Sequence, residues 1–138
     1  MARSRTEVTL GDPIGPVVVP VDRDTLVAYA GASLDQNPIH QDEEFAKAVG
    51  LPDVIAHDMW TMGAASSVVA DWAGDAGRVE SFRTRFTNMV VVPREGAEIE
   101  VSGVVSRIDD EGRVTVDVTA TAEGTKVLGR CSGVVRLD

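Results

Sequence analysis

The sequence predicts an α+β fold in which an antiparallel sheet wraps around one long, buried helix. Residues 59–72 carry small or apolar side chains on nearly every side, with Asp71 as the only charge. A helix that is apolar all round is typical of a protein interior. After Gly77 the chain consists of strand-length segments joined by short turns, and such connections favour antiparallel neighbours.

The elements before this helix are shorter. Residues 8–12 and 14–21 are extended segments interrupted by prolines, so we expect edge strands at best. Residues 22–30 predict a helix that begins at an aspartate N-cap and stops near a glycine. Residues 41–49 predict a second, shorter helix that is closed by the next glycine.

Four strands are predicted after the long helix, over residues 79–92, 98–108, 114–122 and 125–137. The third is the clearest, because valine and alanine alternate there with threonine and aspartate, which requires one buried face. A long helix followed by an antiparallel meander matches the hot-dog architecture. We expect the sheet to bury the whole circumference of the helix, and residues 1–138 to form a single domain.

Composition narrows the class of protein. The chain has 138 residues, 43% of them hydrophobic, and a formal net charge of −9 with scattered basic residues. That balance argues against a nucleic-acid partner. No apolar run is long enough to span a bilayer and no signal peptide is recognisable, so we expect a cytoplasmic protein without a membrane partner. The single cysteine, Cys131, excludes an internal disulfide and a cysteine-based zinc site.

One short segment concentrates reactive side chains. Asp35 and His40 lie five positions apart, with Asn37 and Pro38 between them. Proline restricts its own φ and disfavours the α region for the residue before it, so this segment should be a stiff bend. A neutral imidazole held near a carboxylate can serve as a general acid–base pair. An alternative stays open, in which the aspartate and asparagine make Asx-type turns and His40 caps the next helix.

Two blocks of sequence resemble a known family. Residues 29–40, YAGASLDQNPIH, resemble the hydratase-2 signature of the MaoC-like dehydratases, in which an aromatic and small residues precede Asp-x-Asn-Pro-x-His. Residues 54–63, VIAHDMWTMG, resemble the family's Ile-Ala-His-Gly-Met segment at the start of the hot-dog helix. Within the family the chain looks closest to the B-type subunits of the 3-hydroxyacyl-carrier-protein dehydratases of mycolic acid synthesis.

The resemblance implies an activity and an assembly. The family hydrates trans-2-enoyl thioesters of CoA or acyl carrier protein with (R) stereochemistry, or catalyses the reverse dehydration, without a cofactor. It also implies a double hot-dog, as a homodimer or as a heterodimer with another hot-dog subunit. Carried over to this chain, Asp35 and His40 would hold and activate the water, and Asn37 would orient the site.

The same resemblance implies an oxyanion hole at the start of the long helix. In the family the donor is the backbone N–H of a glycine, and here that position is Asp58. Three accounts of this departure are open. The carboxylate could cap the helix, it could take part in altered chemistry such as that of a thioesterase, or it could weaken catalysis so that the chain serves as an accessory subunit.

Several other residues are candidates for substrate contacts. His57, Trp60 and Thr61 could line the acyl site, although packing or capping roles would explain them equally well. Arg83 and Arg85 share a strand face and could bind pantetheine or nucleotide phosphates, the alternative being a solvated strand face. We find no metal-ligand spacing and no phosphate-binding glycine loop, so no cofactor is expected.

Overall fold

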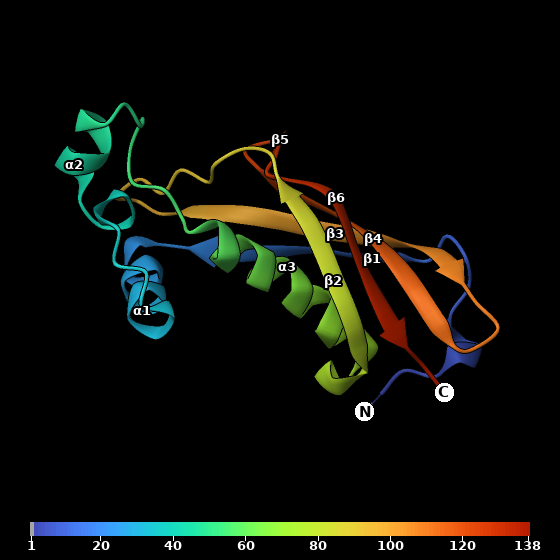
Figure 1. Ribbon diagram of the computed structural model, residues 1–138. Coiled ribbons are helices and arrows are strands. Elements are labelled where there is room, and N and C mark those ends of the chain that lie inside the picture. Colours follow the sequence, from blue (N-terminus) through green and yellow to red (C-terminus); the bar gives the residue numbers. More distant parts are fainter. Residues whose placement is uncertain (1) are drawn as a thin grey trace.

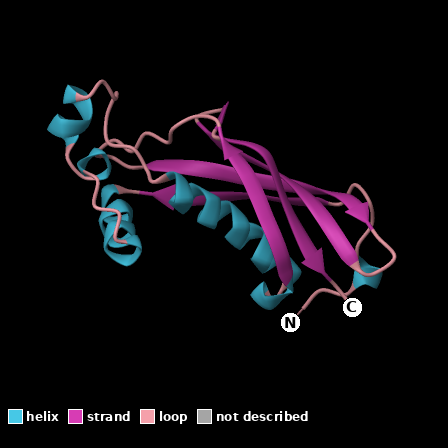
Figure 2. Cartoon of the chain, viewed as in Figure 1, coloured by secondary structure: helices cyan, strands magenta, loops and turns pink. Residues whose placement is uncertain are grey.

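The structure is a computed structural model that describes residues 2–138. One curved antiparallel sheet packs along one side of a long helix, and two short helices lie beyond one end of the sheet (Figures 1 and 2). The strands are β1 (Pro13–Val21), β2 (Val79–Phe86), β3 (Ala97–Ile108), β4 (Arg113–Ala122), β5 (Thr125–Lys126) and β6 (Leu128–Arg136). The α-helices are α1 (Arg23–Ser33), α2 (Glu43–Ala48) and α3 (Asp58–Ala73). Single 3-10 turns are η1 (Arg5–Glu7), η2 (Pro38–His40) and η3 (Ala76–Arg78).

The long predicted helix is α3, and it ends where the left-handed Gly74 (φ 81°) caps it. Its side chains facing the sheet are Thr61, Ala65, Val68, Val69 and Ala73. The expectation of complete burial is wrong for this chain, because the sheet covers only one side of the helix. The opposite side exposes a stripe at intervals of four residues, formed by Met59, Gly63, Ser67 and Asp71.

The order of strands in the sheet is β1-β3-β4-β6-β2, with β5 paired to β4. The predicted meander is confirmed from β3 through β4 to β6. It is wrong for β2, which pairs with β6 at the opposite side of the sheet from β1. The last predicted strand, residues 125–137, divides into β5 and β6. Residues 8–12, predicted as extended, form turns that precede edge strand β1.

The strand predicted over residues 79–92 is also too long. Strand β2 ends at Phe86, and the chain then leaves the sheet to run beside residues 54–56. The Ala56 N–H donates to the Val90 carbonyl at 2.9 Å, and the Val92 N–H donates to the Val54 carbonyl at 2.8 Å. The apolar pattern of residues 90–92 therefore reflects burial beneath the segment that leads into α3.

A cluster of ion pairs fastens the two short helices to the rest of the chain. Arg23, the first residue of α1, contacts Glu43 of α2 at 3.2 Å and Asp53 at 2.7 Å. Its Nε also donates to the Val92 carbonyl at 3.2 Å. Arg23 therefore links α1 to α2, to the segment after α2 that contains Asp53, and to the segment that contains Val92. No helix within residues 2–138 has the length and apolar character needed to cross a membrane.

Candidate active site

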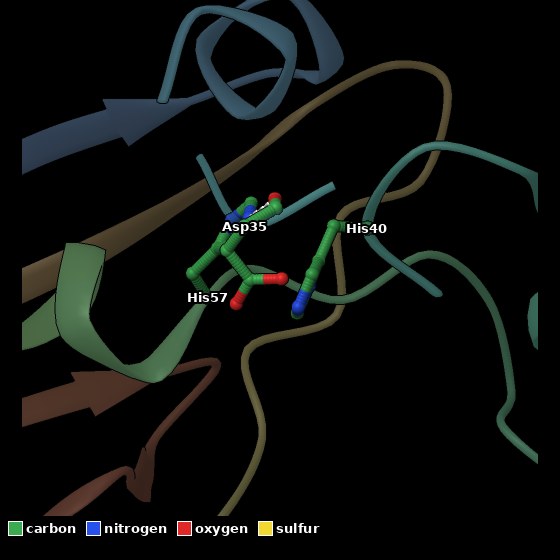
Figure 3. Close-up of side chains that lie close together, drawn as sticks. All are labelled: Asp35, His40 and His57. Carbon is green, nitrogen blue, oxygen red and sulfur yellow. Dashed lines mark hydrogen bonds between the residues drawn. The ribbon is translucent and has the colours of Figure 1, made fainter. Parts of the chain in front are cut away.

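Three polar side chains from separate parts of the chain converge at the N-terminal end of α3 (Figure 3). Asp35 lies between α1 and η2, His40 is the last residue of η2, and His57 is the N-cap of α3. One side-chain oxygen or nitrogen of each residue lies within 4.8 Å of the others. The carboxylate of Asp35 points toward the ring of His40 in Figure 3. The predicted proximity of Asp35 and His40 is therefore present in the structure.

The bend between Asp35 and His40 is held by local hydrogen bonds. The Asn37 N–H donates to Oδ1 of Asp35 at 3.2 Å, and the Ile39 N–H donates to Oδ1 of Asn37 at 3.1 Å. These are the Asx-type turns of the alternative interpretation, and they leave Oδ2 of Asp35 without a hydrogen bond among residues 2–138. His40 does not cap α2, since Asp42 does so through the Phe45 N–H.

The ring of His40 has a defined orientation. Its Nδ1 lies 2.7 Å from the Ile55 carbonyl oxygen, and a carbonyl can only accept, so Nδ1 carries a proton. In the neutral ring the lone pair is then on Nε2. The residue is only 7% exposed, so this nitrogen acts from within a cavity wall and not from the surface.

His57 contacts both members of this pair. Its Nε2 lies 3.1 Å from the main-chain oxygen of Asp35 and must donate to it. Its ring stacks on that of His40, with centroids 3.7 Å apart and planes 21° apart, and the ring of Tyr29 packs against the ring of His57 with centroids 4.8 Å apart. Within residues 2–138 its Nδ1 is buried without a hydrogen-bond partner. Through these contacts His57 helps to hold Asp35 and His40 in position, and it also forms part of the cavity wall.

A cavity of about 440 Å³ opens over these residues. Its wall includes Tyr29, Ile39, Asp58 and Met59 in addition to the three polar side chains. Trp60 instead lines a neighbouring, mainly apolar groove between α3 and β1, and Tyr29 borders both spaces. Thr61 is 3% exposed on the face of α3 that meets the sheet. His57 therefore lines the cavity, Trp60 lies beside the cavity in the neighbouring groove, and Thr61 lies within the core.

Asp58 is the first residue of α3, and His57 occupies the N-cap position. The account in which the Asp58 side chain caps the helix is therefore wrong. Its carboxylate is exposed in the first helical turn. The first N–H groups of a helix have no partner within it, and the Asp58 N–H makes no hydrogen bond among residues 2–138. Asp58, whose N–H is an unpaired donor at the positive end of a 16-residue helix, thus lines the cavity.

The cluster of Asp35, His40 and His57 also has the residue types of a metal site, which spacing alone did not indicate. Its geometry favours proton transfer instead. The two rings are stacked, so their lone pairs run side by side and do not converge on one point. One nitrogen of each ring is already committed to a carbonyl.

Comparison with known proteins gives the family. Residues 5–125 match the model of the MaoC like domain, so the chain belongs to the MaoC-like dehydratase family. A solved MaoC-like dehydratase superposes with a TM-score of 0.96 at 40% identity, covering 99% of this chain and 43% of the other. The (R)-hydratase PhaJ1 of Pseudomonas aeruginosa shares the fold, with a TM-score of 0.87 at 21% identity over 99% of this chain and 87% of its own. The predicted family and hot-dog fold are confirmed.

Curated relatives are longer than this chain. The fatty acid synthase beta subunit TOXC of Cochliobolus carbonum is 36% identical over 124 residues, which is 80% of this chain and 6% of that subunit. The enoyl-CoA hydratase ChsH3 of Mycobacterium tuberculosis is 36% identical over 69 residues, which is 49% of this chain and 24% of that enzyme. The chain therefore corresponds to a small part of these proteins.

Proposed function

We propose that the chain is a hydro-lyase that adds water to trans-2-enoyl thioesters with (R) stereochemistry, or removes it from 3-hydroxyacyl thioesters. The observation that carries this proposal is one cavity lined by the Asp35 carboxylate, the His40 ring and the unpaired N–H of Asp58. The relative ChsH3, named as an enoyl-CoA hydratase, supports the reaction class.

In the hydration direction, water lies between Oδ2 of Asp35 and Nε2 of His40. One of the two groups takes a proton from the water as its oxygen bonds to the β carbon. The C=C electrons move toward the thioester, and the proton that the pair took from the water is delivered to the α carbon. Because the two groups act on the same water, we treat them as a coupled pair and assign no separate roles.

The thioester oxygen gains negative charge in this step. The Asp58 N–H, at the start of α3, is placed to donate to that oxygen, and the helix dipole has the favourable sign. Asn37 contributes by holding the bend in place, because its Oδ1 accepts a hydrogen bond from the Ile39 N–H. Asn37 is not among the residues that line the cavity. No cofactor takes part in this scheme.

The Asp58 carboxylate favours a second candidate function. A negative side chain beside the developing oxyanion opposes thioester activation. The chain would then serve as a weakly catalytic or accessory subunit that binds the thioester beside an active partner. Thioesterase-like or natural-product tailoring chemistry that uses Asp58 is the remaining alternative.

We further propose that two hot-dog chains pair into a double hot-dog, either as a homodimer or with a different hot-dog subunit. Edge strand β2 leaves backbone groups free for pairing. A solved neighbour with the same fold is a complex of two different chains, ChsH1 and ChsH2 of Mycobacterium tuberculosis, with a TM-score of 0.82 at 22% identity over 94% of this chain and 98% of the other. The single-domain organisation, the cytoplasmic location and the nearness to mycolic acid dehydratases stay predictions.

The test follows the loss of conjugated enoyl-thioester absorbance, with a short and a long acyl chain. Asp35→Asn and His40→Ala should each lower kcat by about 10²- to 10⁴-fold, the usual contribution of a positioned acid or base. Glu44→Gln, an acid outside the cavity, is the matched control. Rates that match the wild type in both variants would refute the hydro-lyase. Release of free thiol instead of absorbance loss would indicate the thioesterase.

A further inference from the structure

A second hollow, of about 610 Å³, lies against strands β2, β4 and β6, and the core residues Val118 and Cys131 form part of its lining. Arg83 of β2 pairs with Ser132 of β6, which pairs with Asp117 of β4. Side chains alternate along strands, and the neighbouring Phe82 and Val116 pack into the core around α3. The side chains of Arg83, Ser132 and Asp117 therefore lie on the outer face. We call this space the arginine hollow, and its cationic residues are Arg83, Arg85 and Arg130.

A β-bulge brings the third arginine into the hollow. Arg83 pairs with Ser132 and Arg85 pairs with Gly129, so β6 has one more residue than β2 across this step. Within it, Arg130 adopts a left-handed backbone with φ 46°. This conformation is unfavourable for a side chain larger than glycine, and bulges of this kind redirect a side chain. Arg130 therefore lines the hollow together with Arg83 and Arg85 of β2.

These three arginines have no partner for their charge. None of them makes an ion pair or a side-chain hydrogen bond among residues 2–138. Among the described residues 2–138, Asp117 is the one acid that lines the hollow. The hollow is therefore a local positive site on a chain of net charge −9. Guanidinium groups donate in a planar fork that matches phosphate oxygens, so a phosphate is the ligand that this set of donors fits.

The arginine hollow is also connected to the candidate active site by a short length of chain. Val90 lies five positions after Arg85, so their Cα atoms lie at most about 17 Å apart. The Val90 carbonyl accepts a hydrogen bond from the Ala56 N–H, next to His57. A phosphopantetheine arm is a long flexible chain with a thioester at one end and a phosphate at the other.

We propose that the arginine hollow binds the phosphate-bearing end of the phosphopantetheine thioester whose acyl end enters the cavity at Asp58. This inference rests on the proposed function, because it assigns the other end of the same substrate. CoA and a carrier protein both present such a phosphate. The interaction contributes to binding and not to the chemical step, since the arginines are remote from Asp35 and His40.

The test compares three enoyl thioesters that differ only in the carrier: pantetheine, 4′-phosphopantetheine and CoA. The variants are Arg83→Ala, Arg130→Ala and the double variant, and Arg107→Ala serves as a control arginine outside the hollow. Each single variant should raise KM for the CoA thioester by about fivefold, as for a partly exposed ion pair. The double variant should raise it by more, with kcat unchanged and no effect on the pantetheine thioester.

The result with the phosphopantetheine thioester identifies which phosphate the hollow binds. An equal rise in KM for phosphopantetheine and CoA assigns the hollow to the phosphate that a carrier also presents, and a rise for CoA alone assigns it to the nucleotide phosphates. Unchanged KM for both would overturn the proposal. Calorimetric titration with free CoA separates this result from a failure of the proposed hydration, since CoA affinity must fall in the arginine variants even if no thioester turns over.

Discussion

His57 offers the sharpest test of how the candidate site is held in place. Its Nε2–H donates to the main-chain oxygen of Asp35, and its ring stacks on His40. His57→Phe keeps a stacked ring and removes the donor, whereas His57→Gln can keep the donor and removes the ring. Losing this hydrogen bond costs about 0.5–1.5 kcal/mol, and losing the stacked pair of rings costs about 0.5–1.5 kcal/mol as well.

If Asp35 owes its position to this hydrogen bond, His57→Phe should lower kcat for enoyl-thioester hydration by about 10- to 100-fold with little change in KM. His57→Gln should retain most of the rate. Thermal unfolding of both variants separates positioning from general loss of stability. Equal kcat in the two variants, or wild-type kcat in His57→Phe, would refute the reasoning.

Two further perturbations test individual carboxylates, one at the candidate site and one in the ion-pair cluster of α2. Asp58→Gly should raise kcat by about fivefold, because a like charge near the developing oxyanion costs about 1 kcal/mol in a solvent-exposed setting, while a fall in kcat would mean that the carboxylate takes part in the reaction. The Lys47 ammonium, together with Arg94 and Arg23, lowers the pKa of the Glu43 carboxyl from 4.5 to about 2. Between pH 4.5 and about pH 2 the folded state therefore holds fewer protons on Glu43 than the unfolded state does. The stabilisation of the folded state by ionised Glu43 is thus complete above pH 4.5 and is lost as the pH falls toward about 2. Denaturant titrations at several pH values should show a weaker acid dependence for Glu43→Gln but not for Glu44→Gln, and identical profiles would contradict the assignment.

Much of the fold is predictable because it depends on local physical chemistry. The alternating pattern of β4 requires one buried face, and its predicted range, 114–122, differs from the observed strand by one residue. Asp22 caps α1 and Gly74 ends α3, as their residue types indicate. The Asp35–His40 bend follows from the steric effect of Pro38.

Other predictions failed where local pattern and tertiary packing conflict. The valines of residues 90–92 read as strand, yet Val90 and Val92 are buried beneath residues 54–56. The small and apolar residues of α3 suggested burial all round, although a small side chain is compatible with either a buried or an exposed surface. Which side is covered depends on the width and curvature of the sheet.

Local sequence accounts for the strand periodicity of the second half, the caps of α1 and α3, and the stiff bend that bears Asp35 and His40. These features depend on interactions that reach only a few residues along the chain. The tertiary structure alone decided that β2 lies beside β6, that His57 supports the Asp35–His40 pair, and that Arg130 joins Arg83. Such convergence depends on strand register and on packing between distant segments, and neither is written in the local pattern of side chains.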